Sequence, residues 1–344
     1  IVGPTLGGYL TEALNWRYVF FINLPVGLLA FLGVAAFMPR EETRRRRFDI
    51  MGFAYLAVAV GALQLFLDRG QSAGWFESVE ILLYVALMIS GLWAFVIHCW
   101  GAKDPFVDLA MFRDRNFVMG LVFIFLIGMT LFSGLALLPP LLQKLMGYPV
   151  VTTGLVMAPR GIGTMVSMIL VGRLVGRFDP RGLVLFGLGV TAWSLHLMAG
   201  FETGMDSHLV IWSGVMQGFG LGFVFVPLST LTFATIETRF RGDATAMFSL
   251  VRNMGSGAGI SIVTVVLARM STVNHEELAS TLTAQSAAVR ETIPGLLHGS
   301  QLYAAVADAL VSQQAAMLAF IDKFHLMLIL TLATVPIVLF LRKP

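Results

Sequence analysis

Long runs of apolar residues, separated by short polar connections, make up most of the chain. An α-helix needs about 20 predominantly apolar residues to cross roughly 30 Å of hydrocarbon. The pattern predicts ten such helices, over residues 1–14, 18–38, 50–67, 79–100, 117–138, 153–175, 182–200, 209–233, 244–267 and 323–342. All but the first are long enough to span. We therefore expect an all-α polytopic membrane protein with nine complete spans.

Composition agrees with this reading. Hydrophobic residues make up 57% of the 344 and charged residues 12%, and the mean hydropathy is +0.82, whereas a soluble domain carries about 25% charged residues. The formal net charge is +3, but the basic residues gather between apolar runs, so we expect a lipid bilayer and no nucleic acid as partner. The single cysteine, Cys99, excludes an intramolecular disulfide and a cysteine-based metal cage.

Basic residues lie mainly on one set of connections, which fixes an expected orientation. Residues 39–47 include four consecutive arginines, and residues 101–116 and 172–181 are also basic. Cytoplasmic loops carry an excess of lysine and arginine. This rule places these connections in the cytoplasm and residues 269–322 on the outer side. That outer segment is polar with leucines at helical spacing, so we expect helices outside the membrane, the last of them continuous with the final span. The segment is either a simple cap or a docking surface.

Two stretches near the beginning carry a family resemblance. Gly3-Pro4-Thr5-Leu6-Gly7-Gly8 resembles the antiporter motif in the fifth helix of drug:proton antiporters of the major facilitator superfamily. The stretch from Asn15 to Pro25 looks like the loop and sixth helix that follow. The alternative reading is a generic helix kink, because glycine and proline serve close packing in any membrane helix.

Three later stretches extend the resemblance to most of the chain. Residues 63–78, the segment from Pro139 to Leu155 and the block from Phe248 to Gly259 are similar to EmrB/QacA-type antiporters with fourteen helices. The resemblance implies that the chain is an N-terminally truncated fragment starting in the fifth helix. Residues 1–38 would end the N-terminal bundle, 39–116 would hold the cytoplasmic connections and an extra hairpin, and 117–344 would form the C-terminal six-helix bundle.

The same resemblance implies a function. It predicts a multi-pass protein of the inner (plasma) membrane that exports apolar or amphiphilic compounds in exchange for protons by alternating access. The energy source would be the proton gradient, without a cofactor or metal. Drug-like molecules would be the substrates, and in a Gram-negative cell a periplasmic adaptor and an outer-membrane channel would be further partners. The alternatives are another solute transporter of the superfamily and a membrane enzyme, for which the spans offer only scattered reactive residues.

Charged residues inside or beside the spans are candidates for gating or coupling. Arg160 and Arg252 lie about 10 and 12 Å from the ends of their spans, where a charge must face protein or water. Arg160 could equally snorkel outward or clamp backbone carbonyls. The remaining candidates are Asn253, next to Arg252, and Arg177, Asp179 and Arg181 in a loop that resembles a superfamily motif but carries Gly176 at its acidic position. That loop is otherwise a charged topology signal.

A proton-coupled carrier needs a group whose charge changes, and arginine does not deprotonate in proteins. The last six predicted spans contain no aspartate or glutamate in mid-membrane. We therefore expect the titrating carboxylate in helices that precede this chain, with Asp68 as the one substitute within it. Aromatic and methionine side chains offer an adaptable substrate lining, or alternatively packing or lipid-facing surface. They are Phe125, Met129, Phe132, Met157, Met216, Phe219, Phe223, Met247 and Phe248.

Overall fold

The computed structural model describes residues 2–37, 48–281 and 301–341, and its regular elements within these ranges are all helices. Nine helical segments of the described chain are long and apolar enough to cross a membrane. This confirms the predicted fold class and the nine complete spans. The predicted basic loop at 39–47 and the middle of the 269–322 segment fall largely outside the described residues.

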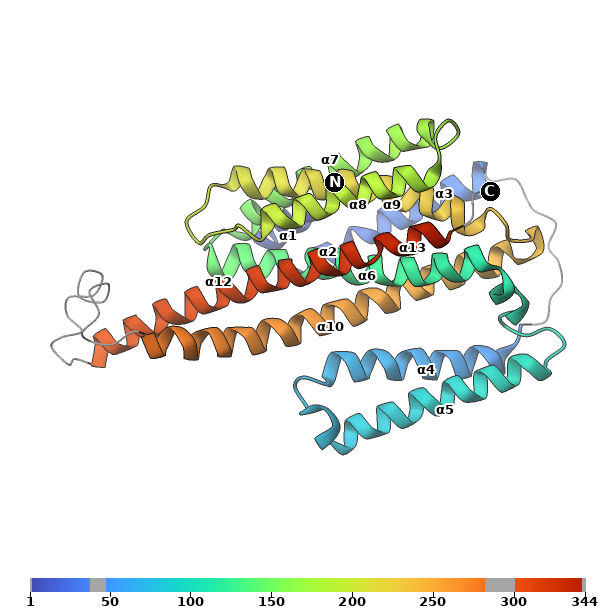
Figure 1. Cartoon of the computed structure of the whole chain (residues 1–344), viewed down its shortest axis with the longest axis horizontal. Helices are drawn as coiled ribbons and strands as arrows, with labels where there is room; N and C mark the ends of the chain where they lie inside the picture. The colour runs from blue at the N-terminus through green and yellow to red at the C-terminus, as the bar shows by residue number, and fades with distance from the viewer. Residues whose placement is uncertain (1, 38–47, 282–300, 342–344) are drawn as a thin grey trace.

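Six long helices form a bundle in the last two thirds of the chain (Figure 1). They are α6 (Arg115–Pro140), α7 (Val150–Leu174), α8 (Pro180–Met198), α9 (Ser207–Phe233), α10 (Arg241–Thr281) and α12 (Gln301–Ala333), with α13 (Val335–Phe340) following the last. Helix α9 packs against α7 and α8, and α10 packs against α6 and α12. We call the end at which α6, α8 and α10 begin the basic end, because the arginine-bearing connections lie there.

Five further helices precede this bundle. They are α1 (Val2–Ala13), α2 (Tyr18–Phe21), α3 (Asn23–Phe37), α4 (Ile50–Arg69) and α5 (Val79–Gly101). Helices α4 and α5 pair as a hairpin that contacts the bundle through α10, while α1 lies against α7 (Figure 1). Short turns connect the long helices, namely η1 (Trp75–Glu77), η2 (Leu109–Arg113), the π turn η3 (Leu141–Leu145) and η4 (Thr238–Phe240).

Beyond the predicted spans, the ends of the last two long helices agree with the expected outer helices, whereas one predicted connection differs. Helices α10 and α12 run to Thr281 and from Gln301, so they continue straight out of the bundle at the end opposite the basic end (Figure 1). Helix α12 contains neither glycine nor proline, and charged residues alone do not end a helix. The predicted connection from Pro139 to Lys144 is also helical, because Leu141 and Leu142 are fully buried and their packing outweighs the proline penalty.

The connection that precedes α6 is partly buried. Val107 and Met111 are almost completely buried in the main hydrophobic core, which also takes residues from α6, α9 and α10. A second core at the opposite end of the bundle collects α7, α8, α9 and α12 residues around Phe201 and Phe324. The bundle is therefore packed around a hydrophobic core at each end.

Candidate functional site

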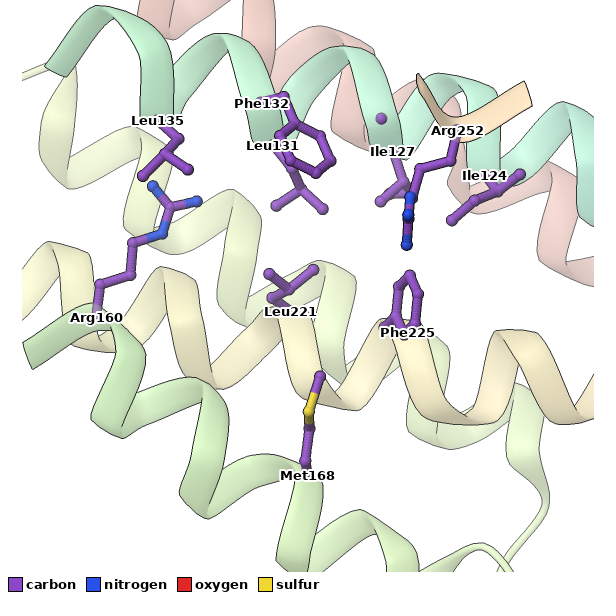
Figure 2. Close-up of a pocket in the computed structure, with 11 residues that line it drawn as sticks. Ile124, Ile127, Leu131, Phe132, Leu135, Arg160, Met168, Leu221, Phe225 and Arg252 are labelled. Atoms are coloured by element: carbon purple, nitrogen blue, oxygen red, sulfur yellow. The ribbon is translucent and has the colours of Figure 1, made fainter. Parts of the chain in front are cut away.

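A cavity of about 340 Å³ lies between α6, α7, α9 and α10, in the middle of the bundle. Its walls are apolar except for two arginines, and within the described chain no carboxylate lines it. The lining residues are Ile124, Ile127, Gly128, Leu131, Phe132, Leu135, Arg160, Met168, Leu221, Phe225 and Arg252. The guanidinium groups of Arg160 and Arg252 lie toward opposite ends, with Leu131 and Leu221 between them (Figure 2). Sequence reasoning thus identified the two charged residues that the fold brings to one cavity.

Glycines set the position of both arginines. A Cβ on Gly218 of α9 would collide with the backbone carbonyl of Arg160, and a Cβ on Gly128 of α6 would lie 2.6 Å from the carbonyl of Arg252. Small residues allow helix backbones to approach this closely in membranes. Each arginine is therefore attached to a backbone held against its neighbour. Close helix packing also explains Gly220 and Gly222, because a Cβ there would collide with Thr191 and Ser167.

The polar groups at one end of the cavity are incompletely paired. Arg160 is 9% exposed, and its Nη1 is buried without a hydrogen-bond partner in the described structure. The same is true of Oε1 of Gln217, one helix away on α9. At the other end, the Arg252 guanidinium lies 5.8 Å from the centre of the Phe225 ring, a cation–π contact. Both arginines thus keep hydrogen-bonding capacity for a further group.

Lys323 is a functional candidate that sequence reasoning missed. It is fully buried on α12, its Nζ lies 4.3 Å from the ring centre of Phe324 and 5.0 Å from that of Phe320, and no hydrogen-bond partner for Nζ lies in the described chain. The sequence interpretation began the last span at this lysine and so took it for a boundary residue. The apolar run from Ala315 to Ile321 ends two residues before this lysine, and it was the signal that the span begins earlier.

The other candidates for gating lie away from the cavity. Asp68 is exposed at the end of α4 and accepts a hydrogen bond from Nε2 of Gln64 at 2.9 Å. Arg177 is exposed at the basic end, and Asp179 caps α8 by accepting from the backbone N–H of Arg181 at 3.0 Å. The Nε of Arg181 is buried without a partner in the described residues.

Most of the predicted substrate lining is placed elsewhere. Phe132 lines the cavity, and Met247 lines a second cavity between α4 and α10. Met157 and Phe248 belong to the packed cores, and Phe219 and Phe223 stack on each other beside Phe186. The remaining three, Phe125, Met129 and Met216, lie on α6 and α9 and line neither of these two cavities. Residue type alone was a poor guide, because it does not say which helix face looks into the cavity.

The block from Phe248 to Gly259 joins α10 to two neighbours at once. A Cβ on Gly255 would collide with the backbone of Phe125, and one on Gly259 with that of Met129, so this face packs on α6. Gly257 faces Gln64 of α4, and the hydroxyl of Ser261 donates to the carbonyl of Leu67 at 2.6 Å. Asn253 in the same block is exposed. The alternating small residues therefore place α10 between α6 of the bundle and α4 of the hairpin.

The predicted antiporter motif forms part of an interface with α7. Gly8 is buried, and a Cβ there would lie 3.0 Å from the carbonyl of Val150, while the hydroxyl of Thr5 donates to the carbonyl of Gly154 at 3.5 Å. Gly3 and Gly7 have open space around them, and Pro4 lies in the same helix. Of the motif's glycines, Gly8 makes the close approach expected of a small residue.

Asp49 joins the hairpin to the connection that follows it. Its carboxylate accepts from the backbone N–H groups of Gly52 at 3.0 Å and Phe106 at 2.9 Å, and it contacts Nε2 of His98 at 2.9 Å. The hydrogen bond from Gly52 is the main cause that holds the pKa of Asp49 below its ordinary value. Among the described residues, Asp49 and His98 included, no group of three His, Cys, Asp or Glu side chains could hold a metal ion.

The fold and the cavity between two membrane-embedded arginines define a multi-pass helical membrane protein with a central cavity. Residues 1–260 match the sequence model of the Major Facilitator Superfamily. The chain belongs to this superfamily, a family of membrane transporters and not of enzymes, and it is a multi-pass protein of the inner membrane.

Similar proteins narrow the comparison. The chain is 33% identical to the multidrug export protein EmrB of Escherichia coli (strain K12) over 285 residues, which cover 82% of this chain and 56% of that protein. It is 32% identical to the fatty acid resistance protein FarB of Neisseria gonorrhoeae over 351 residues, 100% of this chain and 69% of that protein. The chain thus spans little more than half the length of EmrB. These relatives agree with the EmrB-type resemblance of the sequence.

A solved structure agrees on the fold. The crystal structure of a bacterial homologue of the human lysosomal transporter Spinster, in an inward-facing and occupied conformation, superposes with a TM-score of 0.50. The identity is 13%, and the match covers 84% of this chain and 64% of that one.

Proposed function

We propose that the protein exports apolar or amphiphilic compounds from the cell in exchange for protons, by alternating access. The observation that carries the proposal is the cavity with apolar walls and an arginine toward each end, because ligand pockets combine an apolar lining with a few fixed polar groups. The names of the relatives, multidrug export and fatty acid resistance, support compounds of this kind.

The proposed coupling places different roles on different residues. Arg160 and Arg252 cannot themselves carry the proton, because arginine stays protonated in proteins. They would instead favour the ionised form of a nearby carboxylate or stabilise one conformation of the cavity. Asp68, hydrogen-bonded to Gln64 at the hairpin, is the candidate for the titrating carboxylate within this chain.

Orientation and partners are further parts of the proposal. The positive-inside rule places the basic end in the cytoplasm and the projecting ends of α10 and α12 outside. A helical projection beyond the bundle is a suitable surface for a periplasmic adaptor in a Gram-negative cell (Figure 1).

An efflux assay tests the proposal. Cells that express the protein from its natural gene are loaded with the neutral dye N-phenyl-1-naphthylamine, and its export is followed with and without a protonophore. We expect export that the protonophore abolishes and that Arg252→Ala largely removes. Arg239→Ala is the matched control, since this arginine is exposed and pairs with Glu237 at 2.6 Å on the surface. Export at an unchanged rate in the presence of the protonophore would refute the coupling of export to protons.

A further inference from the structure

Two positive charges are buried close together without a counter-charge in the described part of the protein. Arg160 and Lys323 sit on α7 and α12, and Met157, one turn before Arg160, packs in the same hydrophobic core as Phe320 and Phe324, which flank Lys323. No carboxylate of the described chain lies within ion-pair distance of either. Burying one unpaired charge is costly, and two like charges add repulsion to that cost.

Three buried polar atoms at this place lack a hydrogen-bond partner in the described structure: Nη1 of Arg160, Nζ of Lys323 and Oε1 of Gln217. Buried polar groups in native proteins are nearly always satisfied, so orphaned ones call for a specific explanation such as a missing ion or ligand. Two of the three atoms are donors on cationic groups. A ligand that pairs with Arg160 from the cavity must therefore accept hydrogen bonds, and both cations favour a negative charge on it.

We infer that Arg160 and Lys323 form the head-group site for an amphiphilic anion, with Arg160 binding a carboxylate and its apolar chain lying in the cavity toward Leu131 and Leu221. This rests on the proposed function and names the charge of its substrate. The guanidinium of Arg160 points into the cavity beside Leu135 (Figure 2). Planar guanidinium groups bind carboxylates through two parallel hydrogen bonds.

Lys323 supplies the second charge without lining the cavity. Its Nζ lies 5.0 and 4.3 Å from the ring centres of Phe320 and Phe324, and both rings pack in one core with Met157, a turn away from Arg160. A bound anion converts the repulsion between the two cations into attraction of both toward the ligand. A cationic drug, by contrast, would meet two like charges at this end of the cavity and an arginine at the other. The site therefore selects against cations as well as for anions.

A binding measurement with chain-matched probes tests this inference. The purified protein, expressed from its natural gene, is placed in nanodiscs of phosphatidylcholine, so that no anionic lipid competes. Affinities are measured for laurate, dodecanol and dodecyltrimethylammonium, with acetate as a head group without a chain. We expect laurate to bind about tenfold or more tightly than the neutral and cationic probes, as charge-assisted hydrogen bonds imply. Acetate should bind far more weakly than laurate.

Variants assign the preference to the two cations. Lys323→Met should reduce the laurate-to-dodecanol preference about tenfold, Arg160→Gln should reduce it at least as much, and Lys323→Arg should retain most of it. Lys144→Met, at an exposed lysine on η3, should leave the preference unchanged. Equal affinity of the natural protein for laurate and dodecanol, or an unchanged preference in Lys323→Met, would overturn the inference. Acetate binding as tightly as laurate would show that the apolar chain adds nothing to binding, and would leave only a site for small anions.

The binding measurement and the cell export assay together separate failure of this inference from failure of the proposed function. If cells export the neutral dye in a protonophore-sensitive way and laurate shows no preference, only the anion inference fails. If the cells export no dye of any charge, the proposed function fails whatever the binding result.

Discussion

Gln64 of α4 fits against the bare Cα of Gly257 in α10, where a Cβ would collide with the side-chain Oε1. This contact fixes how the hairpin meets the bundle, together with the hydrogen bond from Ser261 to Leu67 one turn further along. Gln64 also donates to Asp68 at 2.9 Å. The contact therefore links a residue of the hairpin that is a candidate for coupling to the helix that carries Arg252.

Gly255→Ala should destabilise the protein, although alanine favours a helix, because its methyl group would collide with the backbone of Phe125, which cannot rotate aside. Overpacking a close contact costs about 1–3 kcal/mol, more than the roughly 0.5–1 kcal/mol gained in helix propensity. Thermal unfolding of the detergent-solubilised protein measures the difference. Gly242→Ala, at a position of α10 with open space around it, is the control and should not lower the midpoint.

A second substitution tests the cause. Gly257→Ala, two residues further along α10, should cost less than Gly255→Ala, because the Gln64 amide that it meets is the end of a flexible side chain and can rotate aside. A loss of stability as large as that of Gly255→Ala would show that the backbone contact with Phe125 is not what decides the cost.

Gly218→Ala should damage the site more than the fold elsewhere. The new methyl group would push α9 away from the Arg160 carbonyl, a backbone atom that cannot rotate aside. We expect reduced dye export at normal expression. Gly189→Ala on α8, where nothing lies within 4 Å, is the matched control. Normal export by Gly218→Ala would mean that the spacing of α7 and α9 does not position Arg160.

Asp49→Ala should loosen the hairpin. Removing a helix N-cap typically costs about 1 kcal/mol, and the N–H of Phe106 loses its acceptor as well. Asp104→Ala, at an exposed aspartate of the next connection, is the control. Hydrogen exchange of α4 amides would report the change, and equal exchange in both variants would contradict the role given to Asp49.

The same carboxylate predicts an acid dependence. Its folded-state pKa lies below the ordinary value of 3.8, so its contribution to stability is present above about pH 4. That contribution is lost as the pH falls through the lowered pKa. Asp49→Ala should therefore reduce the unfolding midpoint near neutral pH and make little difference in strong acid. A deficit that persists unchanged into strong acid would show that ionisation of Asp49 is irrelevant.

Lys323→Met should stabilise the protein while it weakens anion binding. Replacing a buried charge that lacks a partner by a side chain of similar volume removes a desolvation penalty, and comparable replacements have gained about 1–4 kcal/mol. The thermal unfolding midpoint without ligand measures this. A lower midpoint than that of Lys144→Met would show that the charge of Lys323 supports the fold.

The sequence was sufficient for the class of fold and for the residues that stand out chemically. Apolar runs predicted the spans, and Arg160 and Arg252 were conspicuous because charge is rare in such runs. It was insufficient wherever a helix face or a helix start decided the outcome. Phe219 and Phe248 are aromatic like Phe132, yet they face packed neighbours, and Lys323 became interior only because α12 begins at Gln301.

The central claim is that the cavity between the two arginines is the place where the exported compound binds. The chain has one cysteine, so Leu221→Cys in a Cys99→Ser background gives a single reactive thiol in that cavity. The rate of its modification by a membrane-permeant maleimide is measured with and without N-phenyl-1-naphthylamine. At dye concentrations about ten times the dissociation constant, modification should slow about tenfold by mass action, while Ser280→Cys at the exposed end of α10 reacts at an unchanged rate. Unslowed modification at Leu221→Cys, in a variant that still exports the dye, would contradict the claim.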